Sequence, residues 1–427
     1  MTGTSATPNS GPDPLLQRRD RAFGRGAKLF YDEPLHLVRG LGASLFGADG
    51  RRYVDMYNNV ASVGHAHPRI VEAMARQQAT LNTHSRYLSE PAIALAERLT
   101  ALQRVTESAV FSCSGTEAIE IALRMARMAT GAQGIVCTDH TYHGNNTVVG
   151  ALTNLPAGDT RHPWVRSIPF PETLRPLVPG EASADAYIAR LKTAIDDLKA
   201  TGQGFAALIL CPILANEGLP DIPEGFMAKA EALVRAEGGL IIADEVQAGY
   251  GRSGTWWGYD HVGLTPDIVV TGKPMGAGLP LAATTARREI VEQFRAETRY
   301  FNTFAASPLQ GAVGCAVLDV IEEEGLVDHA RTLGAELKAG LKQRLGHTPG
   351  LLDVRGKGLF LAAEFVDDHG GPDAAHAFAL VCALRREGFL TSVDGAFNNC
   401  VKIRPPLVLP REDALAFLDA FDRVTYA

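Results

Sequence analysis

The sequence predicts an α/β protein built around a mostly parallel sheet. Short apolar runs rich in Ile, Val and Leu, such as 240–243 (LIIA) and 267–270 (DIVV), are bounded by Gly or Pro, as buried parallel strands are. Helical patterns alternate with these runs, for example 186–200 (AYIARLKTAIDDLKA) before 205–210 (FAALIL). Strands and helices in this order indicate a doubly wound sheet.

The chain has 427 residues, enough for two or three domains that share a large core. Residues 1–14 are small, polar and Pro-rich, so we expect a disordered tail. The segment 15–60 contains a DG hairpin turn and is expected to pack with a small domain. We place the large domain at 61–320 and a smaller α+β C-terminal domain at 321–427.

The composition is that of an ordinary soluble protein. Hydrophobic residues make up 46% and charged residues 21%, and the net charge of −7 gives no sign of nucleic-acid binding. No apolar run approaches the roughly 18 residues of a membrane span. The six cysteines form no CxxC pair, and His65 and His67 have no third ligand nearby. We therefore expect a cytoplasmic protein that holds no metal and binds neither membranes nor nucleic acid.

A carboxylate and a lysine follow two of the predicted strands. Asp244 comes directly after the run at 240–243, and Lys273 lies just beyond the run at 267–270. Open α/β sheets bind ligands at this edge. Burial lowers the pKa of a lysine and frees its amine to attack a carbonyl, while a carboxylate can hold a positive charge on a heteroaromatic ring. This combination is typical of pyridoxal phosphate chemistry, although a structural ion pair is the alternative.

Two loops beside the same sheet edge carry further candidates. Ser114, Gly115 and Thr116 lie between a short strand and an amphipathic helix. Free backbone N–H groups there can bind a phosphate, although the same residues also make an ordinary helix N-cap. Tyr142 and His143 follow another short strand, where an aromatic side chain can stack on a flat ring; loop packing is the alternative.

Seven motifs, in this order along the chain, resemble the class III pyridoxal-phosphate aminotransferases, the group of acetylornithine, ornithine, GABA and ω-amino acid enzymes. They cover roughly residues 30–420, and the interval of 29 positions between Asp244 and Lys273 (273 minus 244) looks like that of the family. The motifs are SGTEAIEIALRMAR, TYHG, IIADEVQAGYGRSG, PDIVVTGKPMGAGLP, NTFAASP, VRGKGLF and KIRPPL. The resemblance implies the fold type I of pyridoxal-phosphate transferases and pyridoxal 5'-phosphate as cofactor.

The resemblance also implies roles for the residues around the cofactor ring. Lys273 would hold the cofactor as a Schiff base, the internal aldimine, and later move a proton. Asp244 would bond the pyridinium nitrogen, and Gln247 the ring hydroxyl. Tyr142 would stack on the ring face, with His143 close behind it.

The phosphate would be shared between two subunits, according to the same resemblance. Ser114, Gly115 and Thr116 would hold it from one chain. Thr303, in the NTF motif, would reach the phosphate of the neighbouring subunit. This implies a homodimer with shared active sites, with a higher oligomer left open.

The chain departs from the family pattern where a substrate would bind. Cys211 replaces a glutamate, and Asn216 stands where ornithine-type enzymes carry a gating glutamate. Lys402 takes the place of the usual substrate arginine, with Arg404 two residues on and on the same strand face. Lysine cannot grip a carboxylate bidentately as arginine does, so binding of an ordinary α-carboxylate needs another clamp. The substrate-binding candidates are Asn58, Arg86, Asn216, Lys402 and Arg404.

The activity that this resemblance implies is transamination. An amino group would pass from a primary amine or amino acid to a 2-oxo acid, through the Lys273 aldimine and a pyridoxamine phosphate intermediate. YNNVASVGHAHP, LNTHSRYL and KIRPPL also resemble a branch with ethanolamine-phosphate phospho-lyase and alanine–glyoxylate-type enzymes. A lyase of the phospho-lyase kind is therefore the first alternative, a racemase or decarboxylase the next, and a cofactor-binding protein without catalysis the last.

Overall fold

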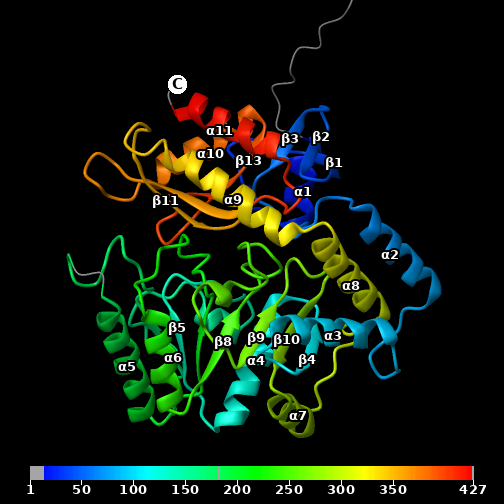
Figure 1. The fold of residues 1–427 in the computed structure, drawn as a ribbon, viewed down its shortest axis with the longest axis vertical. Helices are drawn as coiled ribbons and strands as arrows, with labels where there is room; N and C mark the ends of the chain where they lie inside the picture. Colours follow the sequence, from blue (N-terminus) through cyan, green and yellow to red (C-terminus); the bar gives the residue numbers. More distant parts are fainter. Residues whose placement is uncertain (1–13, 181–182, 426–427) are drawn as a thin grey trace, which may run out of the picture.

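The computed structural model describes residues 14–180 and 183–425. Its largest sheet among these residues has seven strands and lies in the lower half of Figure 1. One strand, β10, is antiparallel to both of its neighbours, and all other neighbouring pairs are parallel. The predicted mostly parallel sheet is confirmed. In order across the sheet, the strands are β4 (Ser108–Ser112), β10 (Ala282–Ala286), β9 (Ile268–Thr271), β8 (Leu240–Asp244), β7 (Ala207–Leu210), β5 (Ile135–Thr138) and β6 (Val165–Ile168).

Helices cover both faces of this sheet: α4 (Gly115–Thr130) and α7 (Arg288–Glu297) on one, α5 (Ala184–Ala200) and α6 (Phe226–Ala236) on the other. Successive strand residues alternate between the faces. Ile242 of β8 packs in one core cluster with Ile119 of α4. Its neighbour Ile241 packs in the other cluster, with Tyr187 of α5 and Phe226 of α6. Burial on both faces explains why these strands are uninterrupted apolar runs.

Three further helices pack together beside β4: α2 (Pro68–Thr80), α3 (Glu90–Gln103) and α8 (Pro308–Glu323). Arg98 of α3 joins Asp319 and Glu322 of α8 through ion pairs of 2.5 and 2.7 Å. Residue 320, where we place the domain boundary, lies inside α8, three residues before its end at Glu323. The division into domains stays a prediction.

A second, antiparallel sheet occupies the C-terminal part of the chain, in the upper half of Figure 1. Helices pack around this sheet, and the predicted α+β character of the region is confirmed. In order across the sheet, the strands are β11 (Leu351–Lys357), β12 (Phe360–Phe365), β15 (Cys400–Ile403) and β14 (Ser392–Asp394). The helices around it are α9 (Leu326–Lys342), α10 (Ala374–Glu387) and α11 (Arg411–Thr425).

The N-terminal segment joins this C-terminal part through a third sheet. The DG hairpin forms as predicted, and the last strand of the hairpin pairs in parallel with a two-residue strand near the C-terminus. Residues 1–13 of the predicted tail lie outside the described residues, while Pro14 begins a helix. The strands are β1 (Leu37–Leu41), β2 (Ser44–Gly47), β3 (Arg52–Asp55) and β13 (Phe389–Leu390). The remaining helices are α1 (Pro14–Phe23) and the short 3-10 helices η1 (Val149–Leu152) and η2 (Gly258–His261).

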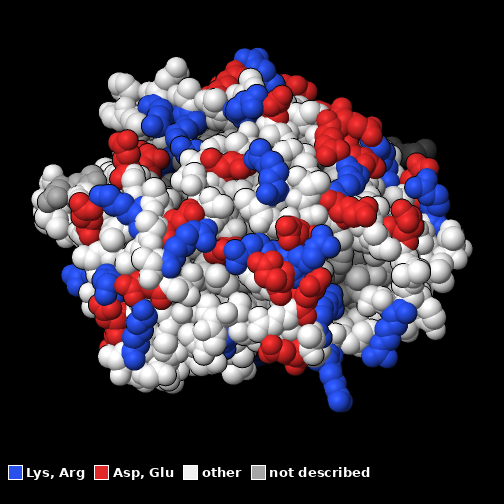
Figure 2. All heavy atoms as spheres, turned by 60° about the horizontal axis from the view of Figure 1, so that its bottom comes forward, with Lys and Arg blue, Asp and Glu red and all other residues white. Residues whose placement is uncertain are grey.

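Charged side chains of both signs are interspersed over the face shown in Figure 2. Charged side chains at the outer helices are often paired, as in the ion pairs Lys199–Glu237, Lys229–Asp185 and Lys192–Asp196. Mixed charge of this kind does not form the single-sign patch of a nucleic-acid surface. Among the described helices, none combines the length and apolarity that crossing a bilayer requires.

Candidate active site

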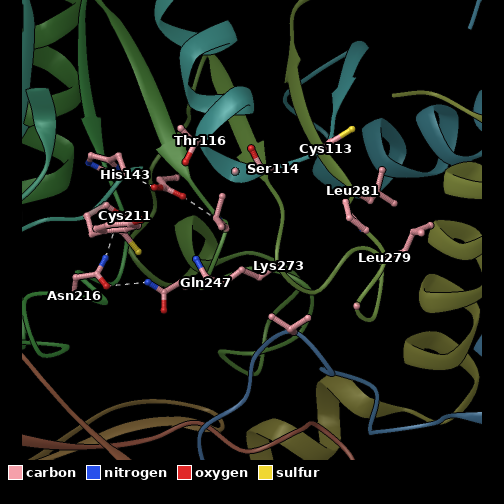
Figure 3. Close-up of a pocket in the computed structure, with 17 residues that line it drawn as sticks. Cys113, Ser114, Thr116, His143, Cys211, Asn216, Gln247, Lys273, Leu279 and Leu281 are labelled. Atoms are coloured by element: carbon pink, nitrogen blue, oxygen red, sulfur yellow. Dashed lines mark hydrogen bonds and ion pairs between the residues drawn. The ribbon is translucent and has the colours of Figure 1, made fainter. Parts of the chain in front are cut away.

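The predicted residues meet in a cavity of about 330 Å³ at the carboxyl ends of β8 and β9 (Figure 3). The start of α4 forms one wall, and the loops after β5 and β7 form another. This is the sheet edge at which ligands were expected. The predicted residues that line the cavity are Ser114, Gly115, Thr116, Tyr142, His143, Asn216, Asp244, Gln247 and Lys273.

Asp244 is the last residue of β8, and both of its carboxylate oxygens accept hydrogen bonds. Oδ2 lies 2.7 Å from Nδ1 of His143, and Oδ1 accepts from the backbone N–H of Val246 at 3.0 Å. His143 is itself buried, and its Nε2 lies 3.2 Å from the hydroxyl of Thr141. Within the described residues the ion-pair partner of Asp244 is His143 and not Lys273. The alternative of a structural Asp–Lys pair therefore does not describe this site.

Lys273 follows β9 by two residues and reaches the cavity, through which it is open to solvent. The surrounding protein desolvates the amine and lowers its pKa from 10.5 to about 8. The carboxylate of Asp244 opposes this effect, whereas the cations of Arg404 and Lys402 add to it. Such an amine is partly neutral at physiological pH, which is what attack on a carbonyl requires.

The start of α4 has the geometry of an anion site. Ser114 is the N-cap, and its hydroxyl accepts from the backbone N–H of Glu117 at 3.2 Å, so the ordinary capping role is present. The N–H groups of the first turn, at Gly115 and Thr116, have no preceding turn to bond. A Cβ on Gly115 would lie 3.1 Å from a methyl group of Val246, so glycine permits this close approach. Capping and anion binding are compatible here.

Tyr142 and Gln247 lie on either side of Asn216. The Nδ2 group of Asn216 donates to the backbone oxygen of Tyr142 at 3.3 Å, and its Oδ1 accepts from Nε2 of Gln247 at 2.9 Å (Figure 3). Tyr142 as a whole is 40% exposed, and it lines the cavity. Cys211 also lines this wall, and burial raises the pKa of its thiol.

Five predicted residues do not line this cavity, and Thr303, Arg86 and Asn58 are three of them. Thr303 is exposed and faces a neighbouring cavity of about 640 Å³, which shares Cys113, Leu279 and Pro280 with the first. Arg86 is exposed, and its guanidinium lies 4.2 Å from the ring centre of Phe301. Asn58 faces a third cavity, and its Oδ1 accepts from the N–H of Val60 at 2.9 Å. Within a single chain, none of the three lies at the Lys273 site.

Lys402 and Arg404 are both buried behind the cavity wall, at the end of β15. Lys402 forms an ion pair with Asp394 of the adjacent strand β14. Arg404 donates to the backbone oxygen of Tyr57 at 3.0 Å and to Oε1 of Gln247. Burial lowers the pKa of both cations. Lys402 is thus already neutralised, whereas Arg404 touches a residue of the cavity.

Sequence reasoning missed several residues around the site. Val246 packs against both Gly115 and Gly272, and it fixes the distance between the start of α4 and the end of β9. Glu217 is buried, accepts from the Thr138 hydroxyl at 2.8 Å, and has a pKa raised by burial to about 7. A lone carboxylate in the apolar, Pro-rich loop CPILANEGLP was the signal for Glu217. No similar signal distinguishes Val246.

The residues present fit pyridoxal 5'-phosphate. The buried carboxylate of Asp244 suits a protonated ring nitrogen, the first turn of α4 suits a phosphate, and Lys273 suits an aldehyde. Among the described residues, no group of three or more His, Cys, Asp or Glu side chains is arranged to hold a metal ion.

Comparison with known proteins gives the same assignment. The family model of class-III aminotransferases matches residues 30–425. A Drosophila melanogaster protein described as alanine–glyoxylate aminotransferase 2-like is 36% identical, over 95% of this chain and 85% of its own length. The ethanolamine-phosphate phospho-lyase homolog 1 of Caenorhabditis elegans is 32% identical, over 99% of this chain and 96% of its own.

A solved structure agrees over almost the whole chain. It is a phospholyase from Arthrobacter in complex with phosphoethanolamine, with a TM-score of 0.92 and 36% identity over 97% of this chain and 99% of that one. Its likeness extends to the central sheet and the C-terminal part alike, which confirms fold type I. The chain therefore belongs to the class-III aminotransferase family, whose cofactor is pyridoxal 5'-phosphate.

Proposed function

We propose that this protein is an aminotransferase that moves the amino group of a small primary amine or amino acid to a 2-oxo acid. One observation carries the proposal: the amine of Lys273, with a pKa lowered by burial to about 8, shares a cavity with Asp244 and the start of α4. The lysine is positioned to accept and return a proton, and the carboxylate to stabilise positive charge. Both tasks belong to the proton shift that transamination requires.

Each of the surrounding residues has a separate task in this scheme. The bound cofactor supplies an electron sink for the carbon that loses its proton. Lys273 takes the proton from that carbon and delivers it to the next position. Asp244 holds positive charge at the ring nitrogen, and His143 orients Asp244 through the bond of 2.7 Å. Tyr142, which lines the cavity, would cover a face of the cofactor ring and limit the access of water.

The test compares removal of the Lys273 amine with removal of an exposed lysine far from the site. Lys273→Ala should abolish turnover, while Lys342→Ala, an exposed lysine at the end of α9, should not affect it. Candidate amines are mixed with the enzyme in the absence of a 2-oxo acid, and the visible absorption band of the bound cofactor is followed. Loss of this band with a donor, and its return with a 2-oxo acid, is the expected result. Turnover by Lys273→Ala would refute the mechanism.

A second candidate is elimination of phosphate from an amino alcohol phosphate. It is favoured by the Arthrobacter phospholyase, at 36% identity and a TM-score of 0.92, and by the nematode relative. Proton removal by Lys273 would be followed by loss of phosphate from the adjacent carbon, and water would then release ammonia and an aldehyde. Phosphate and ammonia formed without a 2-oxo acid, with the cofactor band retained, would select this reaction.

We further propose that the active form is a cytoplasmic homodimer with shared sites. Thr303 is exposed and lies away from the Lys273 cavity of its own chain. Phe304, beside it, is 74% exposed, so this surface also presents an apolar side chain. A second chain that covers this surface would bring its own Thr303 toward the first chain's α4.

A further inference from the structure

The cavity contains few charges that could hold an anionic substrate. Among the described residues that line it, Lys273 is the one lysine or arginine, and this amine is needed for the chemistry. Lys402, at the place of the usual substrate arginine, lies behind the wall and is neutralised by Asp394. Within one chain, a carboxylate or phosphate on the substrate would therefore meet neutral donors of the wall.

Such donors exist because a buried arginine fixes the orientation of two amides. Arg404 has only donors, so the atom of Gln247 that faces it must be the oxygen Oε1. The Nε2 group of Gln247 then donates to Oδ1 of Asn216, and the Nδ2 group of Asn216 donates to the backbone of Tyr142. The hydrogen bonds therefore run in one direction, from Arg404 through Gln247 and Asn216 to Tyr142. Figure 3 shows the bond between Gln247 and Asn216.

This direction decides which atoms of the two amides are left free to bind a ligand in the cavity. Each amide nitrogen carries two hydrogens and uses one of them in the chain of bonds. The second amide hydrogen of Gln247 and that of Asn216 are left without a partner in this chain of bonds, whereas each amide oxygen already accepts a hydrogen bond. The wall at Asn216 and Gln247 is consequently rich in donors. Arg404 forms no ion pair within the described part of the chain, so its charge strengthens the polarisation of these amides.

Asn216 is also held from the side of its backbone. Its N–H donates to Oε2 of Glu217 at 3.1 Å, and Oε1 of Glu217 accepts from Thr138 of β5 at 2.8 Å. Both carboxylate oxygens of Glu217 thus tie the loop after β7 to the central sheet. A side chain anchored at its backbone and at its amide keeps its place when a ligand binds.

We propose that the Nδ2 group of Asn216, oriented by Arg404 through Gln247, binds the anionic group of the substrate, a carboxylate or a phosphate. The assignment rests on the proposed function and narrows its substrate to small amines that carry an anion. Asn216 is the binding residue and Arg404 the positioning residue. Asn216 therefore selects the anion without adding a cation to the cavity beside Lys273.

The first experiment compares matched amines. Wild type, Asn216→Ala and Asn216→Asp are assayed with 3-aminopropanoate and 2-aminoethyl phosphate, and with the neutral 3-aminopropanamide. The ratio of kcat/KM, anionic over neutral, should fall about 10- to 100-fold in Asn216→Ala, the range for a hydrogen bond to a charged group. It should fall further in Asn216→Asp. Gln133→Glu, an exposed amide between α4 and β5, adds the same charge far from the site and should leave the ratio unchanged. Equal ratios in all four proteins would overturn the proposal.

The second experiment needs no turnover. The holoenzymes are titrated calorimetrically with inorganic phosphate and with acetate. Weaker binding by Asn216→Asp than by Gln133→Glu supports the proposal, and equal binding overturns it. If wild type converts none of the amines, the proposed function fails, while this titration still decides the role of Asn216.

The third experiment tests the positioning role. Arg404→Lys keeps a donor-only partner for Gln247 and should retain the anionic preference. Arg404→Gln offers an oxygen as well, which allows the Gln247 amide to turn, and the ratio should fall toward that of Asn216→Ala. A merely structural role of Arg404 would lower kcat/KM for anionic and neutral amines alike, and that result would overturn the positioning role.

Discussion

The lowered pKa of Lys273 can be measured directly in the cofactor-free protein. Its value of about 8, against an ordinary 10.5, means that about half of the amine is neutral at pH 8, compared with roughly 0.3% for an ordinary lysine. At this pH the reactive fraction is thus raised roughly 150-fold. Neutral amine is the form that adds to an aldehyde, so the addition rate should rise with pH and level off above the pKa.

The assay is the rate at which pyridoxal, which lacks the phosphate, adds to the cofactor-free enzyme, followed by absorbance in a stopped-flow instrument. A plateau that begins near pH 8 is expected, after correction with a simple model amine. Asp244→Asn removes a carboxylate that raises the pKa, so its midpoint should lie lower. Arg404→Gln removes a cation that lowers the pKa, so its midpoint should lie higher. A rate that climbs without levelling to pH 10 would show that burial does not shift this lysine.

Three further predictions concern stability and assembly. Asp394→Asn leaves the buried charge of Lys402 unpaired and should lower the free energy of unfolding, measured in urea, by about 3–5 kcal/mol. Adding Lys402→Met should restore most of this lost stability. A double variant as unstable as Asp394→Asn would contradict the pairing. Burial raises the pKa of Glu217 from 4.5 to about 7, so the folded state keeps a proton that the unfolded state releases. Unfolding free energy should therefore fall as pH rises from about 5 to 8, and less steeply in Glu217→Gln; parallel slopes would refute this. The Lys273→Ala and Thr303→Ala variants should each be inactive or impaired alone. They should regain activity when they are mixed and allowed to exchange subunits, because one of the two shared sites in a mixed dimer is intact. No gain on mixing would argue against shared sites.

The strands, and the positions of the cofactor-site candidates beside their ends, were predictable because they follow local rules. A buried parallel strand needs an unbroken apolar run; Asp244 ends one such strand, and Lys273 follows another by two residues. Ser114 precedes an amphipathic helix with the sequence of an N-cap, and it caps α4. In each case one stretch of sequence contains both the element and its functional residue.

The partners of the substrate candidates were not predictable, because they depend on pairing between distant segments. Lys402 is not free to bind a substrate, because it forms an ion pair with Asp394. The register of β14 and β15 places these two residues near each other. Arg404 meets Gln247 across 157 positions of sequence. Thr303 lines a separate cavity of its own chain, and the shared site that the resemblance implies would depend on a second chain. Neither register nor assembly can be read from one stretch of residues.

Gln247 joins three parts of the chain, and this has a consequence for biosynthesis. Its backbone oxygen accepts from Asn59 at 3.2 Å, and its side chain binds Asn216 and Arg404. A ribosome that has translated as far as α9 has already made Lys273, Asp244 and the start of α4, but not Arg404. The nascent chain therefore contains the candidate cofactor residues before it contains β15 and Arg404, which orients the amides of Gln247 and Asn216 in the cavity wall. Binding of the cofactor can therefore begin before the substrate-binding part of the site is complete. That part is completed when β15 of the C-terminal sheet and the following Arg404 have been made.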